Sequence, residues 1–381
     1  MKYCGFIIAF MLNLLYIKAE VITTRYNVTP GAWLCFRKEI YVDNLEKQQH
    51  LKIAADSKYW LWINGDLIVR EGGLKRGPNP NDTYCDEFSE IQGLRKGNNM
   101  VEILVWYFGK DGFSHKNSPT PGIYFDLEVG KQHFVSDSTW KVRRHPSFYV
   151  PEGEKPNYRL PESNIGYDAS KESDLNTLDD TSWVNARDVS LEEAGWNQLI
   201  TRPIPMWKDY GLKKYSKLDY QEDTLIIASL PYNAQVTPYI KLQASQGMKI
   251  DIRTDNYRGG SAPNVFAEYI TKEGVQEFET YGWMNGHQVY YKIPKGVKVL
   301  DVRFRETGYD TAFRGSFSCS DTFYNTLWSK SLRTLYITMR DTYMDCPDRE
   351  RSQWWGDVVN ELGEAFYSLD HKAHLLTKRH S

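Results

Sequence analysis

The feature that most constrains this chain is an abrupt change of hydrophobic period near Ser320. Before this residue, short apolar runs alternate with turn residues, which is the pattern of antiparallel β-structure. After it, a second pattern begins, in which apolar residues recur at helical spacing: Phe323, Leu327, Trp328, Leu332, Leu335 and Met339. Ser320 or Asp321 is placed to cap this helix. The sequence predicts a mainly β chain followed by helices.

Residues 20–147 carry the clearest β pattern. The apolar runs 59–63 and 67–69 flank Asn64-Gly65, a dipeptide that favours a tight hairpin turn. Residues 101–108 form a nearly continuous apolar strand. We therefore expect an antiparallel β-sandwich domain over residues 20–147.

The next two regions differ in composition. Residues 148–204 are rich in Pro, Glu, Ser, Asn and Asp, and this composition is typical of a connecting segment that wraps over its neighbours. Residues 205–318 again contain short apolar runs between turn residues, which predicts a second antiparallel β-sandwich with strands at 224–230, 236–242, 248–253, 289–293 and 297–304.

Two helices are expected in residues 319–381, the second over residues 355–369. A pair of amphipathic helices cannot bury both of their faces against a sandwich and each other. We therefore expect that this helical region is truncated, and that something which should cover the helices is absent.

The N-terminus resembles an export signal. An apolar stretch from Phe6 to Ile17 follows Lys2, and Lys18-Ala19 precedes Glu20. Twelve residues are too few to cross a bilayer, which needs about 20, but they match the apolar region of a signal peptide. We expect residues 1–19 to be removed, no membrane span, and a secreted or periplasmic protein.

Charge and cysteine content exclude several functions. The 47 Lys and Arg residues nearly balance the 49 Asp and Glu residues, so no basic footprint for nucleic acid is present. Four cysteines remain after the predicted signal peptide, without a CxxC pair, and they indicate neither a disulfide framework nor a zinc site. No metal or cofactor is expected.

Aromatic residues make up 14% of the chain, a level found both in β-sandwich cores and in sugar-binding clefts. Trp60 and Trp62 share one face of a predicted strand, and Trp106 lies on another strand. Burial is the commoner fate of such residues, and a sugar-binding platform is the alternative.

The loop between the predicted helices carries the chemistry. Four carboxylates, two arginines and two tryptophans fall between Asp345 and Asp357. Glycoside hydrolysis requires a carboxylic acid that protonates the leaving oxygen, a second carboxylate that activates water, and groups that hold sugar hydroxyls. On residue types alone, a solvated loop of Arg–carboxylate pairs is equally consistent with this composition.

The order of these residues favours the first interpretation. Asp-Cys-Pro-x-Arg-Glu-Arg at 345–351, followed by Trp-x-Gly-Asp at 354–357, resembles the α-L-rhamnosidase family of inverting glycoside hydrolases. Residues 54–65, 282–287 and 305–310 resemble that family as well. The resemblance implies N-terminal β-sandwiches that precede an (α/α)6 barrel, of which only the first helical hairpin is present.

The resemblance also assigns roles to residues. It implies that Glu350 is the general acid, that Asp345 and Asp357 hold the sugar hydroxyls, that Trp354 forms an aromatic wall, and that Arg349 supplies a polar contact. The catalytic base is expected from a glutamate farther along the barrel, for which these 381 residues have no position.

Two functions follow from these observations. The first is a rhamnosidase-like hydrolase that removes terminal rhamnose from a glycoside or polysaccharide, inactive as this fragment alone and completed by a partner chain that supplies the missing barrel. The second is a non-catalytic carbohydrate-binding or adaptor protein built from the β-sandwiches. Further amphipathic helices encoded beyond Ser381 would separate them in favour of the first.

Overall fold

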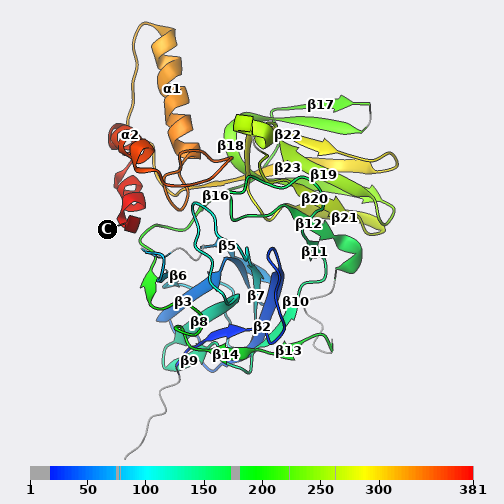
Figure 1. Cartoon of the computed structure of the whole chain (residues 1–381), viewed down its shortest axis with the longest axis vertical. Helices are drawn as coiled ribbons and strands as arrows, with labels where there is room; N and C mark the ends of the chain where they lie inside the picture. The colour runs from blue at the N-terminus through cyan, green and yellow to red at the C-terminus, as the bar shows by residue number, and fades with distance from the viewer. Residues whose placement is uncertain are drawn as a thin grey trace, which may run out of the picture.

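The computed structural model describes residues 18–73, 77, 79–172, 181–222, 224–261 and 263–380. A β-sandwich forms the lower part of the molecule in Figure 1, a second β region lies above it, and two α-helices lie beside this second region. The predicted fold class, mainly β followed by helices, is confirmed. The apolar stretch Phe6 to Ile17 lies outside the described residues.

The lower sandwich consists of two sheets. The first has the order β14(Arg187–Val189), β1(Val21–Thr23), β8(Gly122–Val129), β3(Gln49–Asp56), β6(Thr83–Phe88) and β15(Leu199–Thr201), with β9(Gln132–Val135) also paired to β8. The second has the order β13(Val184–Asn185), β10(Lys141–Arg144), β2(Trp33–Val42), β7(Gly97–Trp106), β4(Lys58–Ile63) and β5(Asp66–Gly72). Leu34, Phe36, Leu61, Ile103 and Phe125 belong to the core between the sheets.

The predicted hairpin at Asn64-Gly65 is confirmed. Asn64 has φ 55° and Gly65 has φ 85°, the positive values that a tight turn between β4 and β5 requires. The Asn64 side chain also accepts a hydrogen bond from the Met100 amide at 3.0 Å, which ties the turn to β7. A residue with a large side chain at position 65 would lose this turn geometry.

Residues 148–204, predicted as a connecting segment, also contribute strands to the sheets. The described residues of this segment, 148–172 and 181–204, contain β13, β14 and β15 of the lower sandwich and also β11(Phe148–Tyr149) and β12(Ile165–Asp168). β12 pairs parallel to β20(Ala267–Ile270), and β15 pairs parallel to β6. These parallel pairs are exceptions to the antiparallel arrangement that the sequence predicted, and they arise because long excursions of the chain return to a sheet edge.

The upper region is a ten-stranded sheet whose middle is one very long strand, β18(Leu225–Ala244). Two separate strands were predicted over this range. The register of the pairing between β18 and β22(Met284–Lys292) shifts between Ser229 and Ala234, where Pro231 lies. The strand is irregular at this point and remains continuous. The other strands are β16(Lys208–Lys213), β17(Lys217–Gln221), β19(Lys249–Thr254), β21(Gly274–Glu279), β22(Met284–Lys292) and β23(Lys298–Gly308).

The two β regions share a hydrophobic junction. Trp33 stacks on Phe148 with ring centroids 3.9 Å apart and on Trp106 at 5.2 Å, and Trp60 meets Tyr281 edge to face at 5.2 Å. These rings belong to one buried cluster with residues of the ten-stranded sheet. The expected burial of Trp60 and Trp106 is confirmed, and the sugar platform is wrong because the upper sheet covers these rings.

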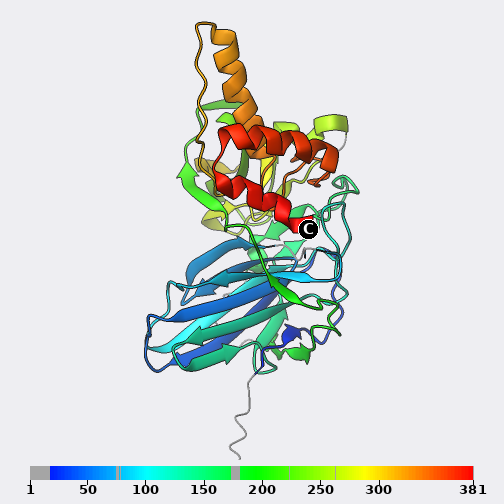
Figure 2. The ribbon, with the colours of Figure 1, turned by 90° about the vertical axis from the view of Figure 1, so that its left-hand side faces the viewer.

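The helices follow the sequence pattern closely. α1(Thr322–Ile337) begins at Asp321, whose side chain accepts a hydrogen bond from the Phe323 amide at 2.8 Å. α2(Trp355–Ser368) is followed by η3(His371–His380), and two short 3-10 turns, η1(Ala169–Lys171) and η2(Asp255–Ser261), lie earlier in the chain. The far end of α1 stands away from the β regions in Figure 2. Among the described helices, none is long and apolar enough to cross a membrane.

Candidate active site

The candidate site is the loop between α1 and α2, residues 338–354, which we call the motif loop. The backbone amide of Met344 donates to the Thr338 carbonyl at 2.7 Å, and that of Asp345 donates to the Ser352 carbonyl at 2.9 Å. The second hydrogen bond joins the two ends of residues 345–352 and closes them into a loop. Side chains that the sequence spaces over eight positions therefore converge.

Glu350 occupies the interior of this loop and is only 5% exposed. Its Oε1 accepts a hydrogen bond from Arg349 Nε at 3.0 Å. Its Oε2 lies 3.8 Å from Arg159 Nε, on the segment that follows the first sandwich. The two carboxylate oxygens thus face different surroundings, one toward the motif loop and one toward residues near 159.

Asp345 lies beside Glu350. Burial raises the pKa of the Asp345 carboxyl above its ordinary value, and the neighbouring Glu350 carboxylate raises it further. The Ser352 amide donates to Asp345 Oδ1 at 3.3 Å, and Arg349 approaches Oδ2 at 3.6 Å. A raised pKa keeps the proton on the Asp345 carboxyl at a higher pH than on an exposed aspartate. The arrangement can hold a transferable proton.

Trp354 and Asp357 are the exposed residues of the predicted site. Trp354 is 45% exposed and occupies the position before the first residue of α2, and Asp357 is exposed in the first turn of that helix. The structure therefore brings Asp345, Arg349 and Glu350 into contact. The roles of all five residues in sugar binding and catalysis remain predictions.

One carboxyl group of the site was not predicted. Glu361 follows Asp357 by four residues, so both lie on one face of α2. Burial raises the pKa of Glu361 to about 7, and the carboxylates of Asp357 and Asp345 contribute to this rise. Helical spacing from Asp357 was the signal that could have identified Glu361.

Two charged residues, the buried Arg351 and the partly buried Asp348, anchor the loop. Arg351 has φ 51°, stacks on the Trp283 ring at 3.4 Å and contacts Glu162 at 3.2 Å. Asp348 accepts a hydrogen bond from Asn264 at 2.9 Å, and burial raises its pKa to about 7. Because these partners belong to the β regions, the β regions fix the position of the loop.

A second buried network lies at the end of α1. Arg340 contacts Glu71 at 2.7 Å, and Glu71 in turn contacts Lys58 at 2.6 Å, all with side chains 5% exposed or less. Gln235 accepts a further hydrogen bond from Arg340 at 2.7 Å. The first sandwich therefore reaches the base of the motif loop through charged side chains.

Two groups of the described residues place three possible metal ligands within 4.8 Å of one another. One is Asp345, Cys346 and Glu350, where the Arg349 guanidinium already contacts both carboxylates. The other is Asp126, Glu128 and His133 on the hairpin of β8 and β9, where His133 hydrogen bonds to Asp126 at 2.6 Å.

Residues 312–378 match the family described as the bacterial α-L-rhamnosidase six-hairpin glycosidase domain. An α-L-rhamnosidase of Formosa agariphila is 24% identical, over 88% of this chain and 38% of that protein.

Solved structures agree on the fold. The GH78 family rhamnosidase of Bacillus sp. GL1 superposes with a TM-score of 0.80 at 16% identity, covering 94% of this chain and 62% of that one. The α-L-rhamnosidase of Dictyoglumus thermophilum superposes with a TM-score of 0.75 at 21% identity, covering 93% of this chain and 43% of that one. The resemblance to the α-L-rhamnosidase family is confirmed, for part of the length of such proteins.

Proposed function

We propose that this chain supplies the general-acid half of an α-L-rhamnoside hydrolase site. The observation that carries the proposal is the pair of adjacent carboxyl groups of Asp345 and Glu350, whose side chains are 8% and 6% exposed and share a neighbour in Arg349. Glu350 gives a proton to the glycosidic oxygen as the bond to the sugar breaks. Asp345, Asp357 and Arg349 hold the sugar hydroxyls, and Trp354 packs on the sugar ring.

Inverting hydrolysis needs a second carboxylate that removes a proton from the attacking water. The two carboxyl groups must be roughly 6.5 to 9.5 Å apart to leave space for that water. Asp345 and Glu350 lie too close for this, because their oxygen atoms fall within 4.8 Å. We therefore propose that the base comes from polypeptide outside these 381 residues, and that the chain alone does not turn over rhamnosides.

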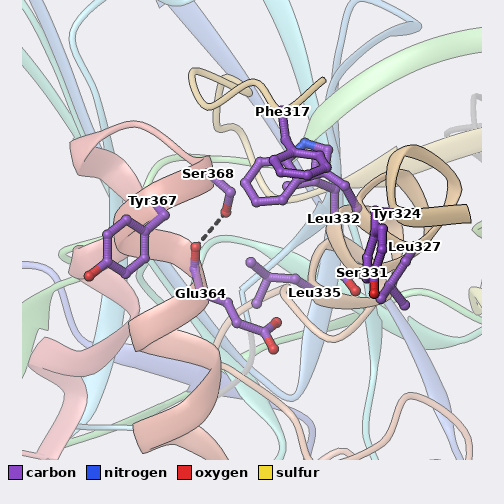
Figure 3. A pocket seen from close by; sticks show the side chains of 10 residues that line it. Phe317, Tyr324, Leu327, Ser331, Leu332, Leu335, Glu364, Tyr367 and Ser368 are labelled. Carbon is purple, nitrogen blue, oxygen red and sulfur yellow. Dashed lines mark hydrogen bonds between the residues drawn. The ribbon is translucent and has the colours of Figure 1, made fainter. Parts of the chain in front are cut away.

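The surface between α1 and α2 is the proposed docking place of that polypeptide. A hollow of about 370 Å³ lies between these helices. The side chains that line it, drawn in Figure 3, are mostly apolar and belong to Phe317, Tyr324, Leu327, Trp328, Ser331, Leu332, Leu335, Glu364, Tyr367 and Ser368. Additional amphipathic helices, continuous with this chain or on a partner chain, would fill it.

We also propose that the chain described here is exported after removal of residues 1–19. Sequencing of the mature N-terminus would test this.

The test uses the chain joined to, or co-produced with, the helices that complete the six-hairpin domain. Hydrolysis of a rhamnosyl disaccharide should appear and should fall by about 10² to 10⁴ in Glu350→Gln, which keeps the shape but cannot give a proton. The loss should be smaller on 4-nitrophenyl α-L-rhamnoside, because nitrophenolate leaves with little help from an acid. An undiminished Glu350→Gln variant would contradict the assignment of the acid.

A further inference from the structure

An exposed aromatic patch adjoins Glu350 on the side away from Asp345. It consists of Phe113, Tyr158 and Trp354, which are 47%, 72% and 45% exposed. Phe113 meets Tyr158 edge to face at 6.1 Å and Trp354 edge to face at 5.9 Å, so the three rings are contiguous. Large aromatic side chains gathered at the surface next to a reactive group indicate a ligand contact.

Arg159 joins this patch to the acid. Its guanidinium lies over the Phe113 ring at 5.4 Å and over the Tyr158 ring at 5.2 Å, while its Nε lies 3.8 Å from Glu350 Oε2. The other oxygen of Glu350 faces Arg349, which also contacts Asp345. The carboxylate therefore lies between a polar side, suited to sugar hydroxyls, and an aromatic side.

The patch is held in place by the backbone. The Phe113 amide donates to the Arg159 carbonyl at 2.8 Å, and the Ser352 hydroxyl donates to the Phe113 carbonyl at 3.0 Å. The first bond links the first sandwich to the segment after it, and the second links both to the motif loop. These hydrogen bonds fix the backbone that carries the rings, so less entropy is lost when a ligand binds.

We propose that Phe113, Tyr158 and Arg159 bind the leaving group of the rhamnoside. This inference rests on the proposed function: a general acid lies beside the glycosidic oxygen, so the group attached to that oxygen extends to one side of Glu350. The aromatic side accepts a flat ring. That ring is either the aryl group of a small glycoside or the pyranose face of the next sugar, since both stack on aromatic side chains.

Binding to the 381-residue chain tests this proposal without turnover. Saturation-transfer NMR titrations compare methyl α-L-rhamnoside, 4-nitrophenyl α-L-rhamnoside and a rhamnosyl disaccharide. A compound that carries a ring on the glycosidic oxygen should bind about tenfold more tightly than the methyl glycoside. Tyr158→Ala and Phe113→Ala should each lose most of this gain and leave the methyl glycoside unaffected. The compound with the larger gain identifies the ring.

Tyr367→Ala is the matched control, because Tyr367 is 75% exposed and lines the hollow between α1 and α2. It should keep the full gain. Three results would overturn the leaving-group site: equal binding of all three compounds, a gain in affinity that survives both patch variants, or a gain that is lost in Tyr367→Ala. None of these results would contradict the proposed acid. Binding of none of the compounds, or methyl glycoside binding that is unchanged in Asp345→Asn, would instead overturn the proposed sugar site on which the patch depends.

Discussion

The junction between the two β regions and the surface of the two helices are both rich in aromatic residues, and they differ in how fully these residues are covered. At the junction, Trp33 and Trp106 are each 1% exposed. On the helices, Phe323 is 64% exposed and Phe366 is 69% exposed. The β regions therefore form a completed unit that holds the motif loop, whereas the helices present an apolar face that lacks a counterpart among the described residues.

The largest effect should come from the junction. Trp33→Ala removes a ring that stacks on two others, and the resulting cavity should lower the free energy of unfolding by about 3 to 5 kcal/mol. Urea denaturation followed by circular dichroism measures this. Trp355→Ala, at a position 56% exposed, is the control and should change stability by less than about 0.5 kcal/mol. Similar losses in both variants would show that the junction is no better packed than the helical face.

The next effect concerns the anchor of the motif loop. Arg351→Met leaves Glu162 buried without its partner and should cost about 3 kcal/mol. The double variant Arg351→Met with Glu162→Gln should recover most of this loss, because no uncompensated charge remains. Chemical denaturation of the single and double variants gives the coupling energy. A double variant no better than Arg351→Met would mean that Arg351 acts through its contacts with Trp283 and the Pro347 carbonyl and not through Glu162.

The fold and the site differ in how far the sequence determined them. Strand positions, the Asn64-Gly65 turn and the Asp321 cap follow from local rules, and the structure confirms each. The long strand β18 and the parallel pairing of β12 do not, because β18 pairs with β22 residues 48 or more positions away and β12 pairs with β20 residues 102 positions away.

The candidate site shows the same division. The sequence indicated Asp345, Arg349 and Glu350 because they fall within one loop. It could not indicate Phe113 and Arg159, which come from other parts of the chain and reach Trp354 and Glu350, respectively, only through tertiary packing. Residue spacing identifies neighbours within one element, and contacts between distant segments require the structure.

A smaller effect should appear as a pH dependence on the helical side. The pKa of Glu361 is about 7 in the folded chain against an ordinary 4.5, so the folded state binds this proton more tightly. Stability should therefore fall as the pH rises from about 4.5 to 7. Glu361→Gln should remove the part of this fall that Glu361 contributes, while Asp348, whose pKa is also about 7, keeps its own part. Above pH 7 the variant should be more stable by about 1 to 2 kcal/mol, an amount reduced by partial solvent access. Thermal unfolding between pH 4 and 8 measures the difference, and Glu90→Gln, at an exposed position outside the helices, should leave the fall unchanged.

The smallest change in stability is expected on the uncovered face itself. Leu327→Ser and Phe366→Ser should each alter the free energy of unfolding by less than about 0.5 kcal/mol, because these side chains bury little surface. Their effect should appear in association instead. Sedimentation velocity should show less self-association for both variants than for the parent chain. A large loss of stability in either variant would mean that the helical face is already packed.

The central claim is that this chain carries the acid and the sugar contacts of a rhamnoside hydrolase without the base. The most direct measurement is a sensitive assay of the purified 381-residue chain with 4-nitrophenyl α-L-rhamnoside, run beside Glu350→Gln. The account predicts that the parent chain releases no more nitrophenol than Glu350→Gln, even at high protein concentration. Sustained release by the parent chain that Glu350→Gln abolishes would contradict it, since the 381 residues would then contain a complete site.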